Sequence, residues 1–336
     1  MDIEGLAHGS PSDDELAAAY DVVVAGGGVA GLSGALVLGR SRRRVAVIDA
    51  GSPRNAPAAG VHNFLTRDGE NPLTLLAQGR AEVRGYGAHV VAGEITTLSR
   101  EQYDSGTGGF TVTLADGRTT RARRLLVTTG LADELPDLPG LREHWGRDVV
   151  HCPYCHGWEF RDQAIGVLAT GPMSVHQALL FRQLSPDVTF FTHTGPPLPA
   201  EQAGQLAARG ITVVPGPVAA LEARGERLTG VRLASGTVVP VRALAVSPRM
   251  VARGQILATL GLKPSEHPSG MGEYIAADPT GRTEVPGIWV AGNVADIAAT
   301  VPASVASGTL AGAHLNADLV AEETEQAVAA RRGASR

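Results

Sequence analysis

The chain has 336 residues, of which 43% are hydrophobic and 42 are glycine, a composition typical of α/β proteins with many tight strand-to-helix turns. Its net charge of −5 argues against a nucleic-acid partner, and no apolar run reaches the length of a membrane span. The first twenty residues lack the basic and apolar regions of a secretory signal. We therefore expect a cytoplasmic protein, long enough for two domains, that binds neither nucleic acid nor membrane.

The N-terminal part of the chain has the alternation of a parallel βαβ unit. A loose tail is expected over residues 1–18. The apolar run at 21–25 predicts a buried strand, the small and apolar residues at 31–40 predict a helix, and residues 44–48 predict a second strand.

A glycine fingerprint, Gly26-x-Gly28-x-x-Gly31, joins the first strand to the helix, and Asp49 ends the second strand. Strand, glycine turn, helix, strand and acid together form the context that a dinucleotide-binding site requires. The sequence therefore predicts a nucleotide site here, against the alternative of a glycine-rich loop without a ligand.

The rest of the chain continues this alternation and contains a second βαβ unit. Further strands are predicted at 109–114, 119–127, 164–169, 188–192, 211–214, 228–233, 238–246 and 287–292. Helices are predicted at 175–184 and, rich in alanine and glycine and suited to close packing, at 302–319.

The predicted fold class is α/β, with two Rossmann-like three-layer domains. The simplest arrangement is a discontinuous first domain, residues 19–138 and 250–325, with a second domain, residues 139–249, inserted into it. Tails are expected at residues 1–18 and 326–336.

The two cysteines of the chain, Cys152 and Cys155, stand two residues apart, between His151 and His156. Cytoplasmic thiols are kept reduced, so such a pair is either catalytic or metal-binding. Zinc usually takes four ligands and a second CxxC is absent, so we expect no metal. Pro153 suits the first turn of a helix, whose N-terminus would lower the pKa of the thiol.

These motifs resemble the low-molecular-weight thioredoxin reductase family of flavoproteins. The resemblance covers nearly the whole chain after residue 20 and rests on the glycine fingerprint, on Thr128-Thr129-Gly130, on the CxxC that opens the inserted domain, and on Trp289-Val290-Ala291-Gly292-Asn293. It implies FAD bound across the first domain and, as is usual in the family, a homodimer.

The resemblance also assigns the cofactor contacts. Gly26, Gly28 and Gly31 would approach the FAD pyrophosphate, and Asp49 would accept hydrogen bonds from the ribose. Gly130 and Gly292 belong to matching motifs. Asn293 stands where the family usually has an aspartate that contacts the ribityl chain, and an amide can still form a hydrogen bond there.

The second nucleotide motif departs from the family. Where a thioredoxin reductase has GxGxxA/G for NADPH, this chain has Ala169-Thr170-Gly171-Pro172-Met173-Ser174, and Pro172 removes a backbone donor. The arginines that would pair with the 2′-phosphate are absent after the next strand. We therefore expect the NADPH-like domain to be degenerate, against the alternative that NADPH still binds.

The redox motif also departs, since CPYCH stands in place of CATCD. A CxxCH motif without an NADPH site resembles the flavin-dependent dithiol oxidases of disulfide natural-product pathways, most nearly those of the dithiolopyrrolone (holomycin) type. The resemblance implies that a small-molecule dithiol is oxidised by oxygen through Cys152 and Cys155, with hydrogen peroxide as product. His156 is the candidate base, and His151 is either a second base or structural.

Three alternatives stay open on the sequence alone. One is an NADPH-dependent reductase of thioredoxin, and the second is a reductase fed by a ferredoxin or a similar protein. The third is a flavin-binding protein without catalysis, which the intact CxxCH motif disfavours.

Overall fold

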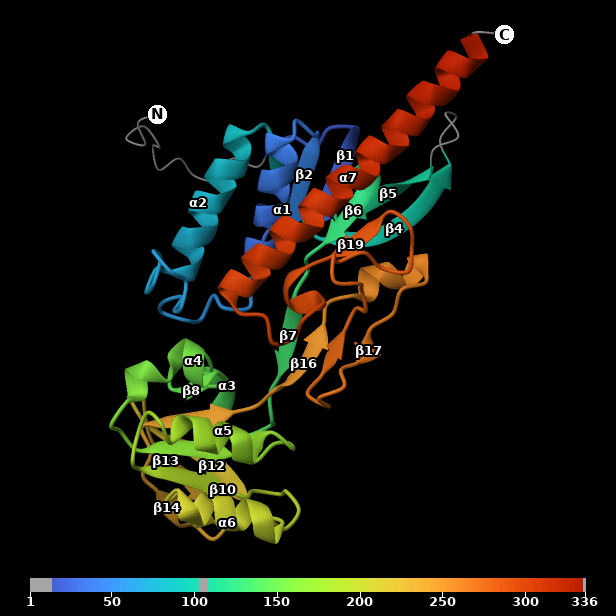
Figure 1. Cartoon of the computed structure of the whole chain (residues 1–336). Coiled ribbons are helices and arrows are strands. Elements are labelled where there is room, and N and C mark those ends of the chain that lie inside the picture. Colours follow the sequence, from blue (N-terminus) through green and yellow to red (C-terminus); the bar gives the residue numbers. More distant parts are fainter. Residues whose placement is uncertain (1–13, 103–107, 335–336) are drawn as a thin grey trace.

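The protein is described by a computed structural model over residues 14–102 and 108–334. Most of the tail predicted for residues 1–18, and the last two residues of the chain, lie outside these ranges. Figure 1 shows two domains, with the inserted domain below the first and a pair of strands between them. Two three-layer α/β domains were predicted, and the structure confirms that fold class.

The first domain is built on a seven-stranded sheet covered by helices. Its strands are β1 (Ala19–Ala25), β2 (Val45–Asp49), β3 (His89–Ala92), β4 (Ile95–Gln102), β5 (Gly108–Leu114), β6 (Thr119–Val127) and β19 (Ile288–Val290), with a small pair β17 (Ser265–Glu266) and β18 (Glu273–Tyr274). Its helices are α1 (Val29–Arg40), α2 (Pro72–Gly85) and α7 (Val301–Ala334), with 3-10 turns η2 (Gln255–Leu260) and η3 (Gly292–Val294).

Strands β3, β2, β1, β6 and β19 run parallel, and β4 and β5 extend β6 as an antiparallel meander. Alternate side chains of β1 point to opposite faces. Val22 and Val24 enter the core beneath the helices, and Val23 enters the core on the other face. Figure 1 shows α2, α1 and α7 side by side on the helix-covered face.

Helices α1 and α7 approach so closely that glycine is required between them. A Cβ at Gly308 would lie 2.0 Å from the Ala30 carbonyl oxygen, and one at Gly312 would lie 2.9 Å from the Gly34 carbonyl oxygen. This confirms the close packing predicted from the alanine- and glycine-rich sequence of α7.

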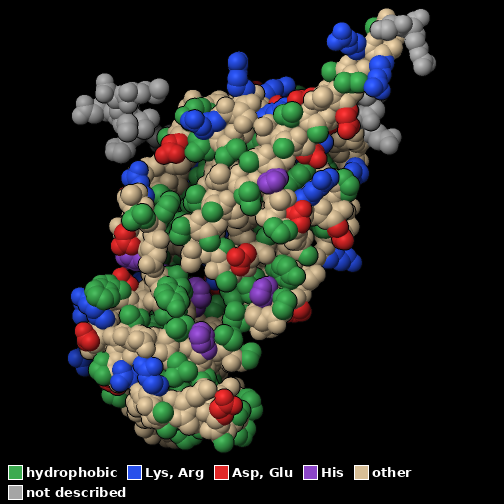
Figure 2. All heavy atoms as spheres, in the orientation of Figure 1, with side chains coloured by type: hydrophobic (Ala, Val, Ile, Leu, Met, Phe, Trp, Pro, Cys, Tyr) green, Lys and Arg blue, Asp and Glu red, His purple; other side chains and the backbone are tan. Residues whose placement is uncertain are grey.

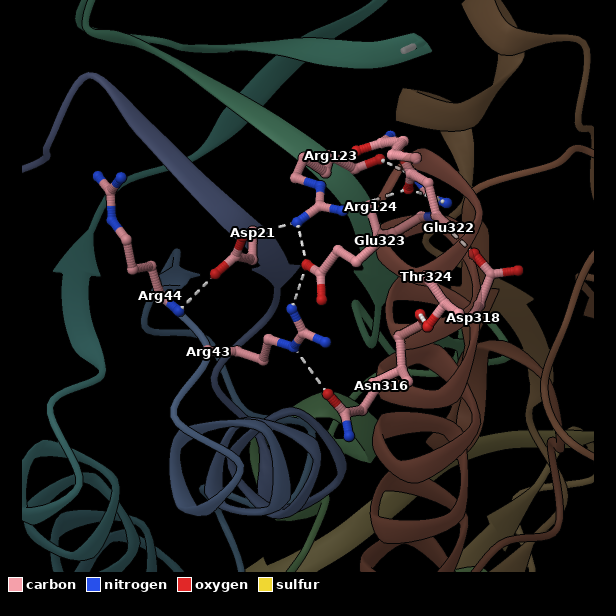
Figure 3. Close-up of polar contacts among 12 residues, drawn as sticks. Asp21, Arg43, Arg44, Arg123, Arg124, Asn316, Asp318, Glu322, Glu323 and Thr324 are labelled. Atoms are coloured by element: carbon pink, nitrogen blue, oxygen red, sulfur yellow. Dashed lines mark hydrogen bonds and ion pairs between the residues drawn. The ribbon is translucent and has the colours of Figure 1, made fainter. Parts of the chain in front are cut away.

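The middle of α7 is also held by an ionic cluster, shown in Figure 3. Glu323 accepts from Arg43 at 2.5 Å and from Arg123 at 2.6 Å, and Glu322 accepts from Arg124 at 2.6 Å. The arginines come from the turn between α1 and β2 and from β6, so the cluster fixes α7 to the edge of the domain opposite the inserted domain.

The inserted domain has a five-stranded parallel sheet in the order β11-β10-β9-β15-β8, with a three-stranded antiparallel sheet, β12-β13-β14, beside it. The strands are β8 (Val149–Val150), β9 (Ile165–Leu168), β10 (Val188–Phe191), β11 (Thr212–Val214), β12 (Val218–Arg224), β13 (Arg227–Leu233), β14 (Val238–Val239) and β15 (Ala243–Val246). The helices are α3 (Leu141–His144), α4 (Pro153–His156), α5 (Ser174–Phe181) and α6 (Ala200–Ala208), with the 3-10 turn η1 (Trp158–Phe160).

Two predicted elements were wrong in their extent. The single strand predicted at 238–246 is broken at Pro240 into β14 and β15, which belong to different sheets, because proline cannot donate to a sheet ladder. The tail predicted from residue 326 is helical to Ala334, since its alanine, glutamate, glutamine and arginine residues favour helix.

The chain crosses between the domains through an antiparallel pair of strands, β7 (Leu131–Glu134) and β16 (Arg249–Ala252), in which Met250 lies opposite Asp133. The predicted boundaries at 138/139 and 249/250 lie close to this pair and stay predictions. Over the ranges that the structure covers, no helix is both long and apolar enough to span a bilayer.

Replacing Glu323 with glutamine is expected to make the unfolding free energy less dependent on pH in the acid range. Hydrogen bonds from Arg43 and Arg123 lower the pKa of Glu323 from 4.5 to about 2. A carboxyl group with a depressed folded pKa stabilises the fold above its ordinary pKa, and this contribution is lost as the pH falls toward 2. Glu323→Gln should therefore lose less unfolding free energy than the wild type between about pH 5 and pH 2.

The matched control is Glu325→Gln on the same helix, because the exposed Glu325 side chain forms no hydrogen bond or ion pair with a described residue. Denaturant unfolding across this pH range measures the slope for each protein. If Glu323→Gln kept the wild-type slope, the ionic cluster would not be holding α7.

Candidate active site

A cavity of about 920 Å³ lies where the two domains meet. It is lined by all but one of the predicted site residues: Gly26, Gly28, Asp49, Gly130, His151, Cys152, Cys155, His156, Gly292 and Asn293. The exception is Gly31. Four of the ten histidines line this cavity, and Figure 2 shows histidine side chains on the face where the domains meet.

The three fingerprint glycines have different roles. A Cβ at Gly31 would lie 2.0 Å from the Gly26 carbonyl oxygen, and one at Gly26 would lie 2.6 Å from that of Thr128, so these two glycines let α1, β1 and β6 pack closely. At Gly28 a Cβ would meet nothing within 4 Å. Gly28 therefore leaves open the part of the cavity next to the start of α1, where a phosphate would meet backbone N–H groups.

Asp49 stands at the end of β2, with its side chain against Gly27. Its Oδ2 accepts from Arg80 Nη2 at 2.8 Å, and its Oδ1 accepts from no described residue. One carboxylate oxygen is thus fixed and the other is left for a hydroxyl donor, which fits the ribose contact predicted for this residue.

The Asn293 amide has a defined orientation. Its Nδ2 donates to the carbonyl oxygens of Asp296 at 3.0 Å and Ala299 at 2.9 Å, and its Oδ1 faces Arg54 Nη1 at 3.5 Å. An aspartate here would place a carboxylate oxygen against two carbonyl oxygens. The amide is therefore suited to this backbone.

An ion pair that the sequence did not predict lies on the same wall. Arg54 binds Asp133 through two hydrogen bonds, Nε to Oδ2 at 2.8 Å and Nη2 to Oδ1 at 2.7 Å. Asp133 is on β7, where the chain leaves for the inserted domain. No local pattern marks Arg54, which lies in an irregular loop five residues after Asp49.

The cysteines lie at the carboxyl end of β8, the edge strand of the parallel sheet. Cys152 and Cys155 form a disulfide with their Cα atoms 5.2 Å apart. Pro153 occupies the first turn of α4, as predicted, and the Cys155 N–H donates to Cys152 Sγ at 3.1 Å. That N–H would stabilise negative charge on Cys152 Sγ when the disulfide opens.

The two flanking histidines have different environments. The two ring nitrogens of His156 are buried without a partner among the described residues, and burial lowers the pKa of His156. The His151 ring stacks on Trp145 at 6.2 Å between centroids. Burial, together with the charge of Arg54, lowers the pKa of His151 to about 4. Both rings are therefore uncharged at neutral pH.

A loop of the first domain reaches the redox motif. His62 lies 3.4 Å from Glu159 and 3.5 Å from Asp68, and Asn63 Nδ2 donates to the Tyr154 carbonyl oxygen at 2.5 Å. These contacts join the cysteine-bearing helix directly to the first domain and hold the disulfide toward the cavity.

In the degenerate nucleotide turn of the inserted domain, a serine side chain binds backbone N–H groups of the turn. The Ser174 hydroxyl accepts from the backbone N–H groups of Thr170 at 3.1 Å and Gly171 at 3.2 Å. Beyond β10, where the family has arginines, His193 Nδ1 accepts from the Val218 N–H at 3.0 Å, and burial lowers its pKa. Two backbone donors of the turn are thus engaged by Ser174, and the arginines that would pair with a 2′-phosphate are missing after β10.

The model of the pyridine nucleotide-disulphide oxidoreductase family matches residues 20–308. The chain belongs to this family. Thioredoxin reductase tcpT of Claviceps purpurea is 30% identical over 318 residues, which cover 90% of this chain and 95% of that protein. Thioredoxin reductase sirT of Leptosphaeria maculans is 29% identical over 310 residues, covering 88% and 93%.

Solved structures agree with this family assignment. The crystal structure of HlmI is 45% identical with a TM-score of 0.89, covering 97% of this chain and 100% of that one. An oxidoreductase from Agrobacterium tumefaciens is 36% identical with a TM-score of 0.83, covering 90% and 98%. The predicted resemblance to thioredoxin reductases and the FAD cofactor of this oxidoreductase family are confirmed.

Replacing Asn293 with aspartate is expected to weaken the protein, although aspartate is the usual residue of the family at this position. The new carboxylate oxygen would face the Asp296 and Ala299 carbonyl oxygens, at a cost of about 1–3 kcal/mol in unfolding free energy. The measurements are denaturant unfolding and the FAD retained after gel filtration.

The control is Asn316→Asp, because Asn316 Oδ1 accepts from Arg43 Nε at 2.7 Å and a carboxylate there keeps its donor. An Asn293→Asp protein as stable as the wild type would show that the amide orientation is not a constraint.

Proposed function

We propose that the protein is an FAD- and oxygen-dependent dithiol oxidase, which closes an intramolecular disulfide in a small secondary-metabolite dithiol and releases hydrogen peroxide. The observation that carries the proposal is the pairing of a Cys152–Cys155 disulfide facing the cavity with a nucleotide turn closed by Ser174. The disulfide can accept electrons from thiols, and the turn closed by Ser174 argues against NADPH as the electron source.

The substrate class is supported by resemblance. The CxxCH motif resembles dithiol oxidases of the holomycin type, and the 45% identity to HlmI extends over nearly the whole chain. A small dithiol also suits a cavity between two domains better than a protein disulfide does, since lining residues on several sides would surround it.

The chain's own residues would act as follows. A substrate thiolate attacks Cys152 Sγ, the Cys152–Cys155 bond breaks, and Cys155 leaves as a thiolate. The second substrate thiol attacks the mixed disulfide, the product ring closes, and Cys152 leaves with the Cys155 N–H donating to its sulfur. When bound, FAD supplies the two-electron acceptor that restores the disulfide and passes the electrons and protons to oxygen as hydrogen peroxide.

His156 is assigned as the base that takes the proton from the substrate thiol. It follows Cys155 directly, and its two ring nitrogens are engaged by no described residue. His151 has a pKa of about 4 and a ring stacked on Trp145, so it is the weaker base and better suited to a structural role.

The orientation of the domains belongs to the same proposal. An oxidase without NADPH need not alternate access to the flavin between a nicotinamide and the cysteine pair, so one orientation suffices. The Asn63–Tyr154 and His62–Glu159 contacts support a fixed orientation with the disulfide at the cavity.

A cytoplasmic homodimer is also proposed. The C-terminal part of α7 projects from the body of the first domain and exposes Val320 and Val328, a face available to a second copy (Figure 1). A monomer mass in sedimentation equilibrium would exclude the dimer.

A second candidate is a disulfide reductase fed by NADPH or a ferredoxin. The printed names of the relatives, thioredoxin reductases among them, favour it. A reductase requires an electron donor other than the dithiol, whereas the oxidase requires only the dithiol and oxygen.

The oxidase should consume one oxygen molecule for each dithiol oxidised and release one of hydrogen peroxide. An oxygen electrode with dithiothreitol measures the uptake, and added catalase should return half of it. Thiol formation from a disulfide at the expense of NADPH, without oxygen uptake, would instead support the reductase.

Replacing His156 with glutamine should lower turnover by about 10²–10⁴-fold, the usual contribution of a general base. The base must be uncharged, so wild-type activity falls as the pH drops through the His156 pKa, and burial places that fall below the ordinary value of 6.5. The variant should lack this acid limb. His314→Gln, an exposed substitution on α7, should keep both rate and profile.

A further inference from the structure

One side of α5 lines the cavity instead of the domain core. The residues on this side, Met173 just before the helix and His176, Gln177 and Leu180 within it, have the spacing of a single helical face. The opposite face of α5 packs into the core of the inserted domain through Val175, Ala178 and Phe181. The helix thus presents a distinct face to the cavity.

This face is held in register with the redox motif. Gln177 is 6% exposed, and its Nε2 donates to the His151 carbonyl oxygen at 2.6 Å, one residue before Cys152. Its Oε1 accepts from the Ser247 hydroxyl at 3.3 Å. Met173, His176 and Leu180 therefore have fixed positions relative to the disulfide.

The cavity-facing side chains of α5 have no other described role. Met173 is 37% exposed, and the exposed His176 makes no hydrogen bond or ion pair with a described residue. In the turn before the helix, the Thr170 and Gly171 N–H groups donate to Ser174 and are therefore not free for a dinucleotide phosphate.

Histidines are the only titratable nitrogen bases in the inserted domain's share of the described cavity wall. Among the residues that the structure describes, this domain contributes no Asp, Glu, Lys or Arg to the lining. Tyr154, which stands between the two cysteines and is 69% exposed, adds an aromatic ring to the same wall. Such a wall suits an apolar ligand without formal charge that carries a few hydrogen-bonding groups.

We propose that the cavity-facing side of α5 is the specificity wall for the dithiol, an inference that rests on the proposed oxidase. Met173 and Leu180 contact the apolar part of the substrate, and His176 forms a hydrogen bond with a polar group such as an amide. The substrate is therefore a small, uncharged, mostly apolar dithiol.

The test compares two probes, dihydrolipoamide, which has an apolar chain and an amide, and dithiothreitol, which has neither. Met173→Ala and Leu180→Ala should each lower the ratio of kcat/KM for dihydrolipoamide to that for dithiothreitol by about tenfold, mainly through KM. His176→Leu should lower the same ratio, because leucine cannot form the hydrogen bond. Leu310→Ala is the matched control, because Leu310 is an exposed leucine on α7 that does not line the cavity.

Thermal melting and the flavin spectrum establish that each variant is folded and loaded. If an alanine variant does not fold, Met173→Glu tests the same wall, since its carboxylate on an exposed position should reject the apolar probe more strongly than the polar one. If the ratio of the two kcat/KM values stayed within twofold of the wild type in all folded variants, α5 would not be the specificity wall. A wild-type protein that oxidises neither dithiol would instead overturn the oxidase.

Discussion

The paired hydrogen bonds between Arg54 and Asp133 join the cofactor side of the cavity to the strand by which the chain leaves the first domain. Asp133 lies on β7, whose pairing with β16 carries both connections to the inserted domain. The placement of the disulfide depends on this junction, because Cys152 is reached through β8 at the edge of the inserted sheet. The loop bearing His62 and Asn63 adds a second attachment near the cysteines.

The inserted domain has kept the architecture of a nucleotide-binding unit while its phosphate turn is engaged internally. Its parallel sheet and the helix after β9 are intact, but Ser174 accepts from the Thr170 and Gly171 N–H groups of the turn between them. The same helix, α5, lines the cavity beside the disulfide. The NADPH-like inserted domain therefore forms part of the proposed substrate site.

Local patterns in the sequence predicted much of this arrangement. Residues close together in the sequence are enough to recognise the glycine fingerprint, the CxxC pair and the parallel strands. The structure brings nearly all the predicted site residues to one cavity. Contacts between distant segments were not predictable: Arg54 with Asp133, and His62 with Glu159, carry no signature in their own neighbourhoods. The break at Pro240 was missed because the apolar residues on both sides continue one strand-like pattern.

The most direct test is an anaerobic titration of the FAD-loaded protein, following flavin absorbance, with NADPH in one cuvette and dithiothreitol in another. A dithiol oxidase should show no bleaching by NADPH, bleaching by the dithiol, loss of that bleaching in Cys152→Ser, and recovery when oxygen is admitted. Prompt bleaching by NADPH would contradict this proposal, because the turn closed by Ser174 would then still accept the dinucleotide and the protein would be a reductase.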